Sequence, residues 1–173
     1  MAEVVKVYRQ SVPAMRFIGK KYGDSDRVNG GFGQQWGDWF SSGWFAQLEN
    51  GIDLKAVYED GNAYIGLMRW KEGEPFEYWI GVFCPENAAV PDGFSFHDFG
   101  ESNLGVAWLY GKEGEVYGQE RICAERCMNE GFKIITDDQG AYWFFERYGC
   151  PRFTTPDVNG NIILDYCHYI ETR

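Results

Sequence analysis

One glutamate stands inside the most aromatic stretch of the chain, the segment Tyr142–Tyr148 with the sequence YWFFERY. Alternate residues of a strand share a face, so Phe144, Glu146 and Tyr148 would point to one side and Arg147 to the other. A carboxylate among rings is costly to ionise without a partner, and burial raises its pKa. The pattern predicts that Glu146 either meets a cationic ligand or handles a proton in a chemical step. The alternative is that Glu146 pairs with an arginine at the strand end and binds no ligand.

The rest of the chain is also rich in rings, because its 13 Phe, 11 Tyr and 7 Trp residues make up 18% of 173 residues. That length is typical of one domain, or of two small fused halves, with enough residues to bury a core. Aromatic side chains dominate protein cores, so most of these rings are expected to pack inside the molecule.

The charge balance argues against nucleic acid as a direct partner. The formal net charge is −10 and the isoelectric point is about 4.6, whereas nucleic-acid binders carry clustered Lys and Arg. An acidic field can attract cationic small molecules, and mimicry of a nucleic acid by the acidic surface is a second interpretation.

The cysteines and histidines do not form a recognisable metal or disulfide pattern. The five cysteines are an odd number without a CxxC pair, so free thiols are expected, and only His97 and His168 are available to complete a metal site. We therefore expect no metal and no cofactor. Residues 1–30 lack an apolar signal core and no run of 18 apolar residues occurs, so a cytoplasmic protein without a membrane partner is expected.

Apolar patterning predicts two successive units of strand, helix, strand and strand. In the first unit the strand covers residues 4–18 with a possible bulge at Pro13, the helix runs from about residue 34 to 48, and a hairpin covers 64–70 and 76–83. In the second unit the strand covers 104–110, the helix 115–129, and a hairpin covers 142–148 and 162–170. Prolines at positions 85 and 91 mark the boundary, which gives halves of about 1–88 and 92–173.

The strands that follow the two helices also share residues. Aligning YIGLMRW with YWFFERY matches Tyr64 with Tyr142, and Met68 then stands where Glu146 stands. The predicted fold is therefore a single α+β domain of two β-α-β-β modules in a pseudo-two-fold arrangement. These modules would form one curved, mainly antiparallel sheet, with two main helices on one face and a ligand groove on the other.

The chain resembles the GyrI-like small-molecule-binding family, which also supplies effector-binding domains to AraC-type and MerR-type multidrug regulators. The resemblance covers nearly the whole chain. It is carried by the first strand (residues 7–18), by EYWIGV (77–82), by VAWLYG (106–111) and, most specifically, by FERY (145–148). Because residues 1–173 leave no room for a helix-turn-helix domain, we expect a standalone member. With its many tryptophans, the chain resembles a subgroup of standalone members that opens the cyclopropane ring of DNA-alkylating cyclopropanoid natural products.

The resemblance implies a site that takes planar, aromatic and often cationic compounds, for sequestration, detoxification or effector sensing. In the family the glutamate matched by Glu146 lies in the pocket, and rings would stack on a flat ligand around it. Whether Trp79 or Tyr78 faces the groove is not fixed by the sequence, and Trp79 is chosen here. The predicted ligand-binding residues are Trp39, Tyr64, Trp79, Trp108, Tyr110, Tyr142, Glu146 and Tyr148.

Two other functions stay open from the sequence. A hydrolase of the cyclopropanoid subgroup would use Glu146 to activate water and Tyr110 or Tyr148 to donate a proton to the developing oxyanion. An acidic protein that modulates gyrase by contact is suggested by the family name, and its protein partner would be unknown.

Overall fold

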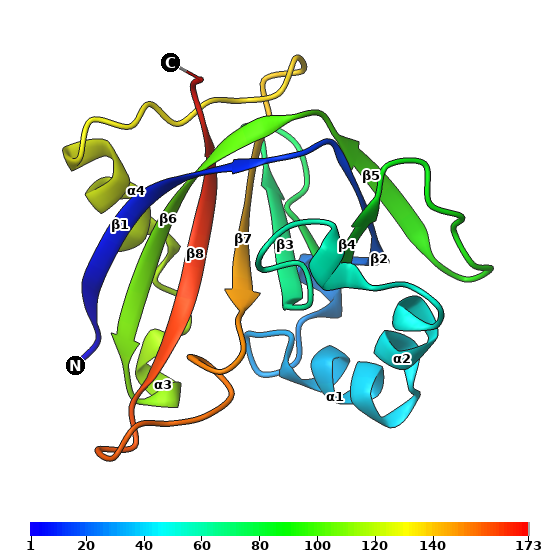
Figure 1. Ribbon diagram of the computed structural model, residues 1–173, viewed down its shortest axis with the longest axis horizontal. Coiled ribbons are helices and arrows are strands. Elements are labelled where there is room, and N and C mark those ends of the chain that lie inside the picture. The colour runs from blue at the N-terminus through cyan, green and yellow to red at the C-terminus, as the bar shows by residue number, and fades with distance from the viewer. Residues whose placement is uncertain (173) are drawn as a thin grey trace.

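The computed structural model of the protein describes residues 1–172, and its eight strands form one antiparallel sheet in the order β1-β6-β8-β7-β3-β4-β2-β5. The predicted α+β architecture, with one curved sheet and helices packed against it, is confirmed (Figure 1). The strands are β1 (Glu3–Val12), β2 (Met15–Tyr22), β3 (Tyr64–Trp70), β4 (Glu77–Pro85), β5 (Ser95–Phe99), β6 (Ser102–Gly111), β7 (Tyr142–Tyr148) and β8 (Ile162–Ile170).

The centre of the sheet is the pair β3 and β7, and the strand order is symmetric about it. On one side follow β4 and β2, and on the other β8 and β6. Leu67 pairs directly with Phe145, which is the residue that the alignment of the two segments places opposite it. A pseudo-two-fold axis through this pair relates Met68 to Glu146.

The outermost strands are exchanged between the two sides. β1, from the first half of the chain, pairs with β6 of the second half. β5, from the second half, pairs with β2 of the first half. The strand expected over residues 4–18 is therefore two strands. Pro13, which has no N–H to donate, lies between β1 and β2, where the chain leaves one edge of the sheet for the strand next to the opposite edge.

The helices form two pairs, and glycine divides each pair. Gly43, with φ 70°, separates α1 (Gly33–Ser41) from α2 (Trp44–Glu49), and Gly118, with φ 71°, lies between α3 (Glu113–Val116) and α4 (Glu120–Asn129). These left-handed conformations favour glycine, so each single helix expected from the sequence is interrupted. Two short 3-10 helices cover Asp24–Asp26 and Leu54–Ala56.

Both helix pairs pack on the same face of the sheet, at opposite ends (Figure 1). Buried side chains of α1 and α2 pack with Ile18, Ile80 and Met68, whereas those of α3 and α4 pack with Leu109 and Tyr166. The middle of this face, over β3 and β7, is left between the pairs. The other face of the sheet buries a separate cluster centred on Phe17, Leu67, Phe83, Phe145 and Cys167.

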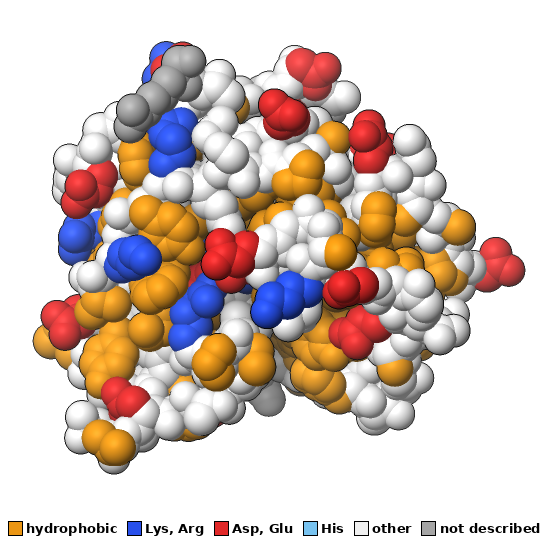
Figure 2. Space-filling view, in the orientation of Figure 1, with side chains coloured by type: hydrophobic (Ala, Val, Ile, Leu, Met, Phe, Trp, Pro, Cys, Tyr) orange, Lys and Arg blue, Asp and Glu red, His pale blue; other side chains and the backbone are white. Residues whose placement is uncertain are grey.

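Charged side chains of both signs are interspersed with hydrophobic ones on the face shown in Figure 2. None of the helices within residues 1–172 has the length and apolar character that a membrane crossing would require. All five cysteines are unpaired, and Cys150 is the exposed one.

Candidate functional site

A cavity of about 1060 Å³ lies on the helix-bearing face, between the two helix pairs. Its volume is at the upper end of the range usual for small-molecule sites, which is roughly 300 to 1,000 Å³. Strands β3, β4 and β7 contribute Met68, Tyr78 and Glu146, the first half contributes Phe32 and Trp36, and the second half contributes Tyr117. The groove predicted for the face away from the helices is thus found beside Glu146 on the helix side, because the helices cover only the ends of that face.

Glu146 is the deepest polar group of this cavity, with 5% of its surface exposed. The Tyr78 hydroxyl donates a hydrogen bond of 2.6 Å to its Oε1, and Trp36 Nε1 donates one of 3.0 Å to the same hydroxyl oxygen. The chain from indole to phenol to carboxylate joins α1, β4 and β7. It fixes the position of the carboxylate at the floor of the cavity.

The close approach of Tyr78 and Glu146 requires a glycine beneath them. Gly66 on β3 pairs with Glu146, and a Cβ at Gly66 would lie 2.4 Å from the Tyr78 hydroxyl and 2.5 Å from Glu146 Oε1. Both distances are shorter than a side chain tolerates, so any residue other than glycine would move one of the two polar groups. The floor of the cavity is therefore shaped by this position.

The pKa of the Glu146 carboxyl is raised to about 7, mainly by burial and to a smaller extent by the Glu120 carboxylate, while hydrogen bonds from Tyr78 and Tyr148 act to lower it. Desolvation dominates because the site offers no positive charge close enough to offset it. Burial and the nearby Glu146 also hold the pKa values of the Tyr78 and Tyr148 hydroxyls well above 10, so both phenols keep their protons at neutral pH. The site combines a carboxyl that changes charge near neutrality with two hydroxyls that can donate.

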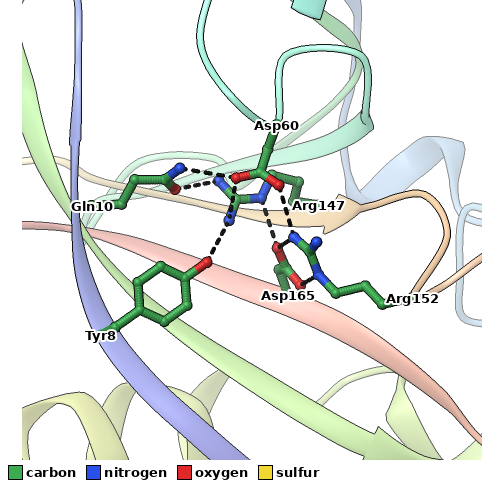
Figure 3. Close-up of polar contacts among 6 residues, drawn as sticks. All are labelled: Tyr8, Gln10, Asp60, Arg147, Arg152 and Asp165. Atoms are coloured by element: carbon green, nitrogen blue, oxygen red, sulfur yellow. Dashed lines mark hydrogen bonds and ion pairs between the residues drawn. The ribbon is translucent and has the colours of Figure 1, made fainter.

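Arg147, the neighbour of Glu146 in sequence, points to the other face and is fully committed there. Its Nε donates to Asp165 Oδ2 at 2.8 Å, its Nη1 donates to Gln10 Oε1 at 2.8 Å, and Asp60 lies 3.4 Å from its Nη2. Figure 3 shows this buried network, which Arg152 joins through Asp60 and Asp165. Two arginines balance two aspartates, so the alternative of an Arg147 partner for Glu146 does not hold.

Rings wall the cavity around the carboxylate. Phe32 stacks on Tyr78 with ring centroids 4.2 Å apart, and Trp36 meets Tyr148 edge to face at 4.9 Å. Phe153 lies against Tyr148 from the loop after β7, at 4.7 Å. These contacts hold Tyr78 and Tyr148 against α1 and the loop that follows β7.

Three of the predicted ligand-binding residues line this cavity: Tyr64, Glu146 and Tyr148. Tyr64 also stacks on Phe45 at 3.7 Å, and burial raises the pKa of its hydroxyl to about 12. Trp39, on α1, is completely buried, and its Nε1 donates to the Tyr22 hydroxyl, so it supports the wall without reaching the cavity.

The other predicted residues lie elsewhere. Trp79 faces the opposite side, because Tyr78 pairs with Met68 and shares its face, and strand neighbours alternate. Trp108 pairs with Asp165 and lies on that opposite side with Tyr110, whose hydroxyl donates to Asp157 at 2.5 Å. Tyr142 shares the face of Glu146, but it lies at the far end of β7 beside Trp70 and is exposed.

Sequence reasoning did not name most of the rings that line the site, among them Phe32, Trp36, Phe40, Tyr78 and Tyr117. Phe32, Trp36 and Phe40 lie at the start of α1 and within it, four residues apart, so this helical spacing turns all three toward the cavity. Tyr78 pairs with Met68, and its hydroxyl lies over Gly66 beside Glu146, so finding it required the register of β4 against β3.

A second cavity, of about 600 Å³, lies on the other face between β5, the β3–β4 turn and residues 135–139. Trp79 and Trp143 line it, and each donates its indole N–H to a carboxylate there, Glu77 and Asp137 respectively. The two cavities are separated by the sheet.

No family model and no curated protein matches the sequence. Solved structures do match, over nearly the whole chain. SAV2435 bound to tetraphenylphosphonium is 17% identical, with a TM-score of 0.65 over 96% of this chain and 94% of that one. The EcmrR C-terminal domain is 9% identical, with a TM-score of 0.57 over 97% and 98%. The chain has the GyrI-like fold.

A third structure with this GyrI-like fold is a hydrolase encoded by lin2189 from Listeria innocua, 14% identical with a TM-score of 0.51 over 96% of this chain and 92% of that one. At such low identities the likeness establishes the fold alone. What this chain binds or catalyses must therefore be inferred from the residues of its own cavity.

Proposed function

We propose that the protein binds planar aromatic organic cations in the cavity around Glu146. The observation that carries the proposal is a carboxylate 5% exposed, without an ion-pair partner among residues 1–172, in a ring-lined cavity of about 1060 Å³. A cation in this cavity would replace the missing counter-charge, and ring contacts with the cation would each add about 0.5 to 2 kcal/mol. Binding of this kind would serve sequestration, detoxification or sensing of such compounds.

Two features favour a cation over a neutral ligand. Arg27 and Arg121, the two basic residues of the lining, already pair with Asp24 and Glu125 outside the cavity, at 2.8 and 3.1 Å. The Glu146 carboxylate, by contrast, has no ion-pair partner among residues 1–172. A neutral ligand would leave this carboxyl protonated, whereas a cation would lower its pKa and bind the ionised form.

The test is a titration of the protein with tetraphenylphosphonium and a planar cationic dye, followed by quenching of tryptophan fluorescence, because Trp36 lines the cavity. Glu146→Gln should raise the Kd of the cations about tenfold or more, because the charge contact is lost. The Kd of a neutral analogue of equal size should change less than about twofold. Glu72→Gln, the same change at an exposed position outside the lining, is the matched control. Equal weakening of charged and neutral ligands by Glu146→Gln would remove the charge role.

A second function is favoured by one observation, the Glu146 pKa of about 7 beside a phenol that keeps its proton. In the hydrolysis of a cyclopropane conjugated to a dienone, Glu146 would take a proton from water as the water oxygen bonds to the ring carbon. The broken carbon–carbon bond would send its electron pair to the dienone oxygen, which would take a proton and become a phenol. Tyr78 or Tyr148 would donate to that oxygen, in place of Tyr110, which lies on the opposite face.

Incubation of the protein with a cyclopropanoid dienone separates the two functions. Hydrolysis predicts a ring-opened, water-added product by mass spectrometry, and Glu146→Gln should slow its formation by about 10² to 10⁴-fold. The compound could instead be recovered unchanged while it prevents a competing dye from quenching the tryptophan fluorescence. That result would leave binding as the function.

A further inference from the structure

The cavity carries more negative charge than a single cation requires. Three carboxylates line it: Glu146 at the floor on β7, and Glu113 and Glu120 at the wall formed by α3 and α4. The two arginines of the lining have acidic partners that lie outside it. The three glutamates are therefore the uncompensated charges of the site.

The two wall carboxylates are set apart from Glu146 in depth and in surroundings. Glu146 is 5% exposed, Glu120 is half-buried at the first position of α4, and Glu113 is exposed. The Tyr117 hydroxyl donates to Glu113 Oε1 at 3.0 Å, which holds this carboxylate beside the Tyr117 ring in the same wall. The site thus has one anionic position at its floor and a second, ring-flanked one toward its mouth.

The electrostatics show that the two positions act on each other. Burial is the main cause of the raised pKa values of Glu146, Tyr78 and Tyr117, and the charges add to it: the Glu120 carboxylate raises the pKa of Glu146 and Tyr78, and Glu146 raises the pKa of Tyr117. Like charges in one cavity repel, and a ligand with one cationic group at each position would relieve that repulsion while making both contacts. The volume of about 1060 Å³ leaves room for a ligand long enough to reach from floor to mouth.

We propose that the cavity selects elongated organic dications, with one cationic group at Glu146 and the other at the Glu113 and Glu120 wall. This inference rests on the proposed function and names its ligand class. Its physical basis is that the second group gains an ion contact and a ring contact that a monocation of the same length lacks.

The experiment compares bis-quaternary ammonium alkanes with alkyltrimethylammonium ions of the same chain length by calorimetry at moderate salt. The dication of the best-fitting length should bind about 2- to 30-fold more tightly than its monocation, corresponding to one added cation contact. Affinity should pass through a maximum as the chain is lengthened, because both ends must be placed at once. The monocation has the more apolar tail, so a greater affinity of the dication cannot come from hydrophobic contact.

Variants at the wall decide where the second charge binds. Glu120→Gln, and the double change with Glu113→Gln, should bring the ratio of the monocation Kd to the dication Kd close to one, because the dication loses a contact that the monocation never made. Glu130→Gln, the same change at an exposed position just after α4 and outside the lining, should preserve the advantage. Far-ultraviolet circular dichroism and urea unfolding would show that the variants are folded.

The outcomes separate this inference from the function on which it rests. If monocations bind and dications gain nothing, or if the wall variants weaken both classes equally, the dication site is refuted and the single-cation function stands. If neither class nor the planar dye binds the unaltered protein, the proposed function itself fails.

Discussion

Replacing the buried glutamate by its uncharged amide, Glu146→Gln, should stabilise the protein more at high pH than at low pH. Burial raises the folded-state pKa of Glu146 to about 7 from an ordinary 4.5. Between these values the folded protein holds a proton that the unfolded chain has released, so stability falls as the pH rises. At about 1.36 kcal/mol per pKa unit, a shift of this size costs the wild type about 3 kcal/mol once the pH is above 7.

The measurement is urea unfolding of both proteins at pH 5, 6, 7 and 8, followed by tryptophan fluorescence. The difference in free energy of unfolding, variant minus wild type, should grow by about 2 to 3 kcal/mol from pH 5 to pH 8. The comparison of proteins is essential because burial lowers the pKa of His168 to about 4, which makes stability rise with pH from about 4 to 6.5. That opposite trend is present in both proteins and cancels.

The groups that face Glu146 do not obscure the effect in this range. The pKa values of the Tyr78, Tyr148 and Tyr166 hydroxyls are all raised above 10, so these phenols stay neutral. A pH-independent cost of burying the Gln amide changes the difference in free energy of unfolding equally at every pH, so it does not alter the dependence on pH. A difference constant to within about 0.5 kcal/mol from pH 5 to pH 8 would mean that Glu146 is already ionised at pH 5, and would refute the account of its burial.

Three further predictions follow from contacts described above. Cation affinity should rise as the pH goes from 6 to 8 and level off above the Glu146 pKa of about 7, whereas in Glu146→Gln it should be flat; a wild-type affinity independent of pH in fluorescence titrations would contradict this. Gly66→Ala should lower the free energy of unfolding by about 1 to 3 kcal/mol and weaken cation binding, because the added methyl would meet Tyr78 and Glu146. Its control is Gly37→Ala in α1, which has open space around it and should raise the free energy of unfolding by about 0.5 to 1 kcal/mol; urea unfolding measures both. Arg147→Met should lower the free energy of unfolding by about 3 to 5 kcal/mol, since it leaves Asp165 and Asp60 sharing Arg152, and a loss below 1 kcal/mol would show that the network is dispensable.

Local pattern was sufficient to predict much of the sheet. Strands β7 and β8 begin and end at the expected residues, because alternating rings and branched side chains are bounded there by clear turns. The helices were harder to bound, since a glycine at positive φ is indistinguishable in sequence from a helical one, and Gly43 and Gly118 both interrupt a predicted helix. Strand β5 was missed because it has only five residues, and none of its three ring-bearing side chains is buried. Such a segment shows little of the alternation that marks a strand.

The site could be predicted within one strand and not across strands. On β7, period two places Glu146 and Tyr148 together as expected. The choice between Trp79 and Tyr78 depends on the register of β4 against β3, which is a tertiary property that no single strand encodes. The same holds for Trp108 and Tyr110, whose face is set by the pairing of β6 with β8.

The exchange of β1 and β5 between the two sides has a consequence for how the molecule can be divided. A fragment ending near residue 90 would carry β1 without β6, and would expose the edge of β2 that β5 covers. Each half would thus present bare strand edges of the kind that promote aggregation. Despite its internal repeat, the protein should therefore melt as one unit, and neither half should survive alone.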